Sequence, residues 1–284
     1  MSSPALSVTA ASRSRYLHGF WSPTRGVRLP ADRHDLVARC AALCAVLPEL
    51  VAFSGETSVE LWEGVCGSGD SLEVTLPTGA HPVRRAGVRA RRRDLLQRDV
   101  ADLHGLPVTS PERTFVDVAE RLSVPRLVSV GDDFLRRGLC TRADIVEVIG
   151  RSTGQRGLRS AKRAAELLDP RAESPRESLT RALIVEAGLP APTPQVGIHD
   201  SRGRFIARGD LVYEDLKIVI EYDGHHHLTL EGQRRDARRR GELGLEDWLI
   251  VTVVPADIHQ PQELIAKVFR ALSARGVRPT PCPT

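Results

Sequence analysis

Three acidic residues, Asp210, Glu221 and Asp223, lie in one short stretch of the chain and could together do chemistry. At an effective dielectric constant of about 20, two carboxylates about 4 Å apart repel each other by about 4 kcal/mol. Such a cluster is expected to bind a cation or to take up a proton. Ligands that are all oxygen favour a hard ion, so Mg²⁺ or Mn²⁺ is the expected cofactor.

Two predicted strands, joined by a turn at residues 213–216, must position these acids. Apolar residues alternate with polar ones before the turn, and β-branched residues dominate after it, which is typical of strands. A register that pairs Asp210 with Val219 makes Glu221 a diagonal neighbour of Asp210, roughly 7 Å away or less. Asp223 shares their face because side chains alternate along a strand.

The same residues also fit a surface hairpin whose acids are solvated and bound to basic side chains. The basic side chains available for this are Arg204, Arg208 and Lys217. The motif by itself does not separate the two interpretations, so its surroundings matter.

A helix is predicted to begin just before this hairpin. Ser174 to Glu177 read Ser-Pro-Arg-Glu, which is the pattern of a capping box with proline at the first helical position. The boundary between two domains is expected near residues 169–174. Glu177 therefore fits the role of a capping residue of this helix.

A basic helix is predicted to follow the hairpin, over residues 229–243. Arginines three and four residues apart lie on one helix face, and either they contact phosphates or they form a solvated face. The DNA-binding candidates among them are Arg234, Arg235, Arg238 and Arg239.

The first half of the chain predicts an α+β domain over residues 16–168, entered by a loop-rich segment at 16–30. A strand predicted at 87–92 is basic on both faces, which fits either an edge strand protected by charge or contacts with phosphates. The arginines of this basic cluster are Arg84, Arg85, Arg89, Arg91, Arg92 and Arg93.

Composition limits the class of protein. The net charge of +4 and the pI near 9.0 fit binding to nucleic acid without requiring it. Five cysteines without a Cys-x-x-Cys pair indicate neither a disulfide framework nor a zinc ribbon, so we expect a cytoplasmic protein. No transmembrane run or leader is predicted, and residues 1–15 and 276–284 are expected to be tails.

From residue 171 to 275 the predicted order is helix, three strands, helix, strand, helix. This order, with acids in the first helix and in successive strands, resembles the PD-(D/E)XK restriction-endonuclease superfamily. Residues 221–227, which read Glu-Tyr-Asp-Gly-His-His-His, resemble more narrowly the domains related to very-short-patch-repair (Vsr) endonucleases. Residues 109–119, which read Thr-Ser-Pro-Glu-Arg-Thr-Phe-Val-Asp-Val-Ala, resemble actinobacterial proteins grouped with AbiEi-type antitoxins.

The resemblance implies an α/β protein in which a restriction-endonuclease-like mixed sheet, flanked by helices, follows an α+β N-terminal domain. It implies that Asp210 and Glu221 bind the metal and that Glu177 orients a metal-bound water. Asp223 stands where the superfamily usually has lysine, and His227 is then a candidate base or ligand.

Two functions are consistent with these expectations. The first is a metal-dependent endonuclease that hydrolyses DNA, and the alternative is a non-catalytic, antitoxin-like regulator that binds DNA on a retained nuclease fold. Nucleic acid, expected to be DNA, is the partner in both, although RNA is not separated by sequence. A toxin partner and the oligomeric state are left open.

Overall fold

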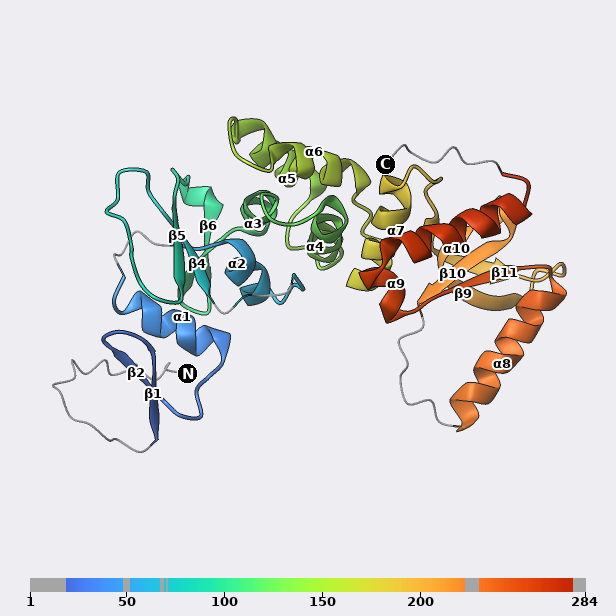
Figure 1. The fold of residues 1–284 in the computed structure, drawn as a ribbon, viewed down its shortest axis with the longest axis horizontal. Helices are drawn as coiled ribbons and strands as arrows, with labels where there is room; N and C mark the ends of the chain where they lie inside the picture. Colours follow the sequence, from blue (N-terminus) through green and yellow to red (C-terminus); the bar gives the residue numbers. More distant parts are fainter. Residues whose placement is uncertain (1–18, 48–51, 67–68, 70, 223–229, 278–284) are drawn as a thin grey trace. The chain divides into compact units, whose positions relative to one another are not determined.

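The computed structural model describes residues 19–47, 52–66, 69, 71–222 and 230–277. The expected tails at 1–15 and, for the most part, 276–284 lie outside these residues, as do Asp223 and His227. Contacts divide the chain into two compact units, residues 1–121 with 143–158 and residues 122–142 with 159–284. The chain is mixed α/β, as predicted (Figure 1).

The first unit contains a hairpin, a mixed sheet and helices. Its strands are β1 (Phe20–Thr24), β2 (Val27–Pro30), β3 (Ala52–Phe53), β4 (Leu72–Leu76), β5 (Val88–Arg92), β6 (Val100–Leu103) and β7 (Leu106–Thr109). Its helices are α1 (Leu36–Cys44), α2 (Gly55–Leu61), the 3₁₀ turn η1 (Gln97–Asp99), α3 (Pro111–Val118) and all but the first residue of α5 (Arg142–Arg151).

The mixed sheet of this unit has the strand order β5-β4-β3-β7-β6, so β5 is an edge strand. Every residue of β4 is buried, because the strand pairs on both sides and packs against helices. Phe53 and Val74 in the sheet pack with Cys40 and Leu43 of α1 to form the core. The strand at 87–92 was predicted correctly, but the hairpin β1–β2 lies where the sequence predicted loops.

The second unit contains a four-stranded sheet with helices on both faces. Its helices are α4 (Val124–Arg136), α6 (Leu158–Leu167, less its first residue), α7 (Pro175–Glu186), the 3₁₀ turn η2 (Glu214–Leu216), α8 (Leu230–Leu245), α9 (Pro255–His259) and α10 (Pro261–Ala274). Its strands are β8 (Thr193–His199), β9 (Phe205–Tyr213), β10 (Ile218–Tyr222) and β11 (Leu249–Val253).

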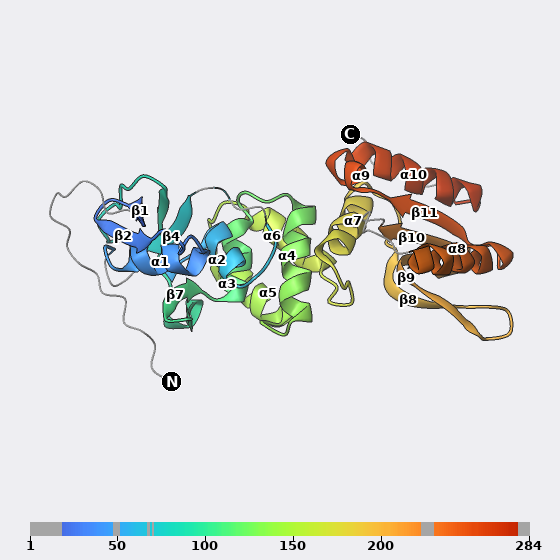
Figure 2. The same ribbon diagram turned by 90° about the horizontal axis from the view of Figure 1, so that it is seen from below.

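The sheet has the order β11-β10-β9-β8 and is mixed, because β10 pairs parallel with β11 and antiparallel with β9. One face packs Leu211 and Ile220 against Ile184 of α7 and Val268 of α10. The other face packs its apolar residues against Leu243 of α8. Helices therefore cover both sides of the sheet, as the two views together show (Figure 1 and Figure 2).

Helix α4 packs against α7 within this unit. Arg181 of α7 donates to Asp132 Oδ2 at 2.8 Å, and the Asp169 amide donates to Asp132 Oδ1 at 2.6 Å. Ser129 donates to the Pro175 carbonyl at 2.9 Å. The contacts thus place α4 with the four-stranded sheet, whereas the sequence placed the domain boundary after residue 168.

The register of β9 and β10 differs from the predicted one by two residues. Tyr213 pairs with Ile218 and Val212 with Val219, so Asp210 does not face Val219. The chain turns through η2 and through Lys217, which has a left-handed φ of 50°, and these residues extend the turn beyond 216. Because a shift by two keeps the alternation of side chains, Asp210 and Glu221 still share a face.

Candidate functional site: an acidic row across the second sheet

Asp210 and Glu221 belong to a row of polar residues that crosses the four strands. The pairing of Leu211 with Ile220 makes Glu221 the direct neighbour of Asp210, and Glu221 is paired with Thr252 on the other side. The pairs on either side of Gln195 place it opposite Asp210. The Tyr222 amide donates to Asp210 Oδ2 at 3.3 Å, which ties the two strands together at this level.

Glu177 is buried at the start of α7 and performs the predicted capping role. The Glu177 amide donates to Ser174 Oγ at 3.2 Å, and Ser174 Oγ donates to Glu177 Oε1 at 2.8 Å. Glu177 Oε2 accepts bonds from the Glu173 amide at 3.0 Å and from Gln195 Nε2 at 2.7 Å. Both carboxylate oxygens are therefore occupied by donors of the protein itself.

Asp210 binds a proton more readily than an ordinary aspartic acid. Burial raises the pKa of Asp210 to about 6, with smaller upward contributions from the charges of Glu177 and Glu221. The Tyr222 amide and the guanidinium of Arg239 act in the opposite direction. The structure thus brings Glu177, Asp210 and Glu221 close enough to influence one another.

Arg239 of α8 occupies the position in front of Glu221. Its Nη1 donates to Glu221 Oε1, its Nη2 donates to Glu221 Oε2 at 2.9 Å, and Nη2 also contacts Asp236 Oδ1 at 2.6 Å. The Glu221 side chain is 10% exposed and that of Arg239 is 31% exposed. This bidentate ion pair balances the negative charge of Glu221 with a side chain of the protein itself.

The other three predicted DNA-binding arginines, Arg234, Arg235 and Arg238, are exposed on α8. Arg238 Nε donates to Glu242 Oε1 at 3.1 Å along the helix. Asp223 and His227 lie outside the described residues. The structure therefore brings together three of the five predicted catalytic residues. Arg239 differs from the other three arginines, because it is partly buried and bonded to Glu221.

The described residues, as they are arranged, do not form a metal site. Within the ranges given above, no group of three or more His, Cys, Asp or Glu side chains is placed to hold a metal ion. Glu221 is not free to bind a metal because both of its oxygens are bonded to Arg239. The oxygens of Glu177 are likewise bonded, to Ser174, Glu173 and Gln195.

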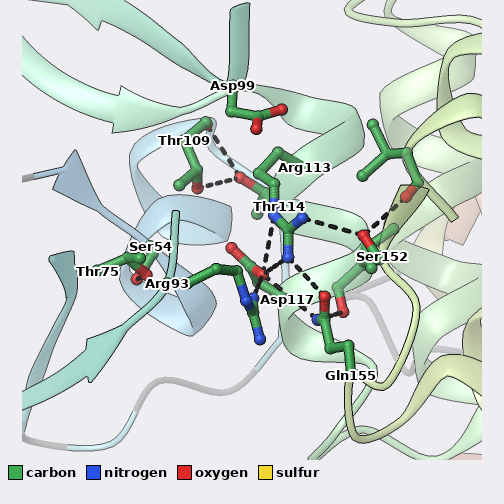
Figure 3. Close-up of polar contacts among 12 residues, drawn as sticks. Ser54, Thr75, Arg93, Asp99, Thr109, Arg113, Thr114, Asp117, Ser152 and Gln155 are labelled. Atoms are coloured by element: carbon green, nitrogen blue, oxygen red, sulfur yellow. Dashed lines mark hydrogen bonds and ion pairs between the residues drawn. The ribbon is translucent and has the colours of Figure 1, made fainter. Parts of the chain in front are cut away.

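A second polar cluster lies in the first unit, around Arg113 of α3 (Figure 3). Arg113 Nε donates to Asp117 Oδ1 at 3.0 Å, its Nη1 donates to Ser152 Oγ at 3.1 Å, and its Nη2 donates to Gln155 Oε1 at 2.7 Å. Arg93 also bonds to Asp117. Because these side chains bind one another, the cluster fastens the segment after α5 to α3 rather than offering a reactive group.

The basic cluster around β5 divides into two parts. Arg89, Arg91 and Arg93 form ion pairs with Glu73, Glu120 and Asp117 respectively, which supports the interpretation of a charged edge strand. Arg84 and Arg85 precede the strand and lie beside the β1–β2 hairpin.

The fold defines a two-unit α/β protein with an acidic row in the four-stranded sheet of its second unit. Residues 70–170 match the family model of the AbiEi antitoxin C-terminal domain, which includes the motif at residues 109–119. Two uncharacterized proteins of Mycobacterium tuberculosis are similar over 255 residues, Rv2248 of strain H37Rv and MT2308 of strain CDC 1551. Each is 29% identical, over 85% of this chain and 89% of its own length. No solved structure matches.

Sequence reasoning missed Gln195 as a member of the acidic row. It has a left-handed φ of 57°, and its buried Oε1 has no hydrogen-bond partner. Its position at the start of an expected strand gave no signal of this role.

The helices in the described part of the chain lack the length and apolar character needed to cross a membrane.

Proposed function

We propose that this protein is a DNA-binding regulator of the antitoxin type, which holds DNA without cutting it. The match of residues 70–170 to an antitoxin domain supports the class. A toxin protein is accordingly the proposed partner, and the four-stranded sheet serves as a scaffold for the basic helix α8.

The ion pair between Arg239 and Glu221 carries this proposal. A divalent cation that binds Glu221 would have to displace the guanidinium of Arg239. That guanidinium makes two charge-assisted hydrogen bonds to the Glu221 carboxylate, which is nearly buried. Removing one partner of such a pair leaves the other charge without compensation, which is costly. The protein therefore already supplies the positive charge that a nuclease would obtain from its metal.

The exposed arginines of α8 support contact with DNA. Arg234, Arg235 and Arg238 lie on a helix and can reach phosphates, and contacts with phosphates hold DNA irrespective of sequence. Removing charge from this face is expected to weaken the binding of all DNA sequences alike.

The experiment compares binding and cleavage on the same DNA. Supercoiled plasmid and a labelled linear duplex are incubated with the full chain in EDTA, in Mg²⁺ and in Mn²⁺. We expect retention of the duplex in all three conditions and no nicking of the plasmid. Metal-dependent nicking that disappears in Glu221→Gln would overturn the proposal.

A metal-dependent endonuclease is the second candidate, and one observation favours it. Glu177, Asp210 and Glu221 converge, and the pKa of Asp210 is raised to about 6, as expected of acids placed together for a function. Asp210 and Glu221 would have to hold Mg²⁺ or Mn²⁺, which requires Arg239 to release Glu221. Cleavage of DNA in Mn²⁺ by the parent, lost in Asp210→Asn, would favour this candidate.

A further inference from the structure

An open pocket of about 780 Å³ lies in the first unit, between the β1–β2 hairpin and the residues just before β5. Two separate segments of the chain form it, one around residues 22–26 and the other at 84–86. The described lining includes Ser22, Thr24, Arg25, Gly26, Arg84 and Arg85.

The charged side chains that are described around this pocket are all positive. Three of its lining residues are arginines, and no carboxylate is among the described residues that line it. Elsewhere around β5, Arg89, Arg91 and Arg93 bond to acidic side chains, as Arg91 does to Glu120 at 2.8 Å. The pocket therefore gathers positive charge, and the described residues that line it supply no acid to balance that charge.

Arg85 fixes the shape of the pocket. Its Nη1 donates to the Arg25 carbonyl at 2.7 Å and to Thr24 Oγ1 at 3.4 Å, so it links the loop before β5 to the hairpin. Ser22 Oγ bonds to the carbonyls of Thr24 and Val27 at 2.9 and 2.8 Å, which holds the hairpin itself. Arg25 and Arg84 are exposed on this fixed support.

We propose that this pocket binds a phosphate of the DNA backbone, with Arg25 and Arg84 as the residues that contact it and Arg85 as a positioning residue. Planar guanidinium groups bind phosphate oxygens through paired hydrogen bonds, and a backbone support that is already fixed by Arg85 does not have to be ordered on binding. The inference rests on the DNA-binding function proposed above and adds a second contact surface to that of α8.

The test measures binding of a labelled 20-base-pair duplex to the full chain by fluorescence anisotropy, over a range of salt concentrations. The variant Arg25→Ala/Arg84→Ala removes two exposed side chains and leaves Arg85 in place. We expect a loss of affinity of about tenfold or more and a slope of log K against log salt that is less steep by about 2. The effect should be the same for duplexes of unrelated sequence.

The matched control is Arg33→Ala/Arg98→Ala, which removes the same charge from two exposed side chains of this unit that pair with Asp35 and Glu147. It should change affinity and salt slope much less. If the parent binds DNA and the two double variants lose affinity equally, the pocket proposal is wrong while the proposed function stands. If the parent does not bind DNA, both are wrong.

A further arm distinguishes DNA phosphate from a small phosphate ligand. Thermal melting of the parent and of Arg25→Ala/Arg84→Ala is followed with and without millimolar inorganic phosphate, and sodium sulfate at equal ionic strength serves as the comparison. Phosphate-dependent stabilisation that is lost in the variant, together with unchanged DNA binding, would assign the pocket to a small ligand and overturn the proposal.

Discussion

Asp210 links the charge of the acidic row to the stability of the fold. Its folded-state pKa of about 6 lies above the ordinary value of 3.8, so the folded protein favours the protonated form. The stability that this proton provides is fully present below about pH 4 and is lost as the pH rises through about 6.

The variant Asp210→Asn should therefore gain stability relative to the parent as the pH rises. The amide cannot ionise beside Glu177 and Glu221, and its oxygen can still accept the bond from Tyr222. We expect a difference near zero at pH 4 that grows to the order of 1 kcal/mol in favour of the variant above pH 6. Urea unfolding at several pH values measures it.

The control for this prediction is an aspartate whose pKa is shifted in the opposite direction. The bond from the Arg204 amide, followed by its side-chain bond, holds the pKa of Asp200 below its ordinary range. Asp200 therefore contributes stability above its unfolded pKa that is lost as the pH falls. Asp200→Asn should be less stable than the parent at neutral pH, and a gain there like that of Asp210→Asn would contradict both assignments.

Arg239 stabilises the second unit through its pair with Glu221. Replacing it by methionine keeps an apolar stem but leaves the Glu221 carboxylate nearly buried without a counter-charge. We expect a loss of about 2 kcal/mol in the free energy of unfolding, measured by urea titration.

The double variant Glu221→Gln/Arg239→Met tests whether this loss comes from the pair. It should be more stable than Arg239→Met alone, because no buried charge is left unpaired. Equal stability of the two variants would mean that Arg239 acts by packing and not by charge.

The sequence predicted part of this site. Strand alternation is enough to place Asp210 and Glu221 on one face. The predicted register was wrong by two residues, but a shift by an even number of residues keeps both side chains on that face. The partnership of Arg239 with Glu221 was not predictable, because it depends on how α8 packs across the sheet. Gln195 was missed because a left-handed residue inside a strand leaves no pattern in the sequence.

At the scale of elements, the segment between α5 and α6 is fastened to α3. Gln155 Nε2 donates to the Val116 carbonyl at 2.9 Å, in addition to the bond that Gln155 receives from Arg113. Gly157, with φ of 80°, follows at a point where an added Cβ would lie 2.4 Å from backbone atoms of Ala119 and Glu120.

Gly157→Ala should therefore destabilise the protein much more than Gly154→Ala. Both glycines have positive φ, but a Cβ at Gly154 would meet nothing within 4 Å. We expect a cost of about 1 kcal/mol at Gly154 from backbone strain alone and about 3 kcal/mol or more at Gly157, where overpacking adds to it. Thermal melts of the two variants measure the difference, and similar losses would contradict the close approach.

Elements with strong local signals were predictable, and elements that depend on distant partners were not. The predicted strand at residues 87–92 is β5, and the capping box at Ser174 begins α7 as expected. The hairpin β1–β2 was missed because glycine, proline and arginine dominate its sequence. The strands β6 and β7 also went unpredicted, although they form a regular antiparallel pair.

At the scale of the whole molecule, the chain passes three times between the two units, at about residues 122, 142 and 158. The four-stranded sheet therefore depends on α4, which comes from the middle of the chain. A fragment of residues 171–284 lacks Asp132, the buried partner of Arg181.

We expect the fragment of residues 171–284 to be less stable than the fragment of residues 122–284. Losing α4 removes the ion pair of Asp132 with Arg181 and exposes to water the face of α7 that α4 covers, at a cost of about 3 kcal/mol. The midpoint of urea unfolding, followed by tryptophan fluorescence of Trp248, measures this. Equal midpoints would show that the sheet does not need α4.

The pairing of Asp132 with Arg181 also has a consequence for synthesis. The ribosome makes Asp132 first and adds its partner 49 residues later. Helix α4 cannot bury its acidic side chain until α7 has left the exit tunnel, because a lone buried carboxylate is costly. The second unit is therefore completed only after the whole of the first has been translated.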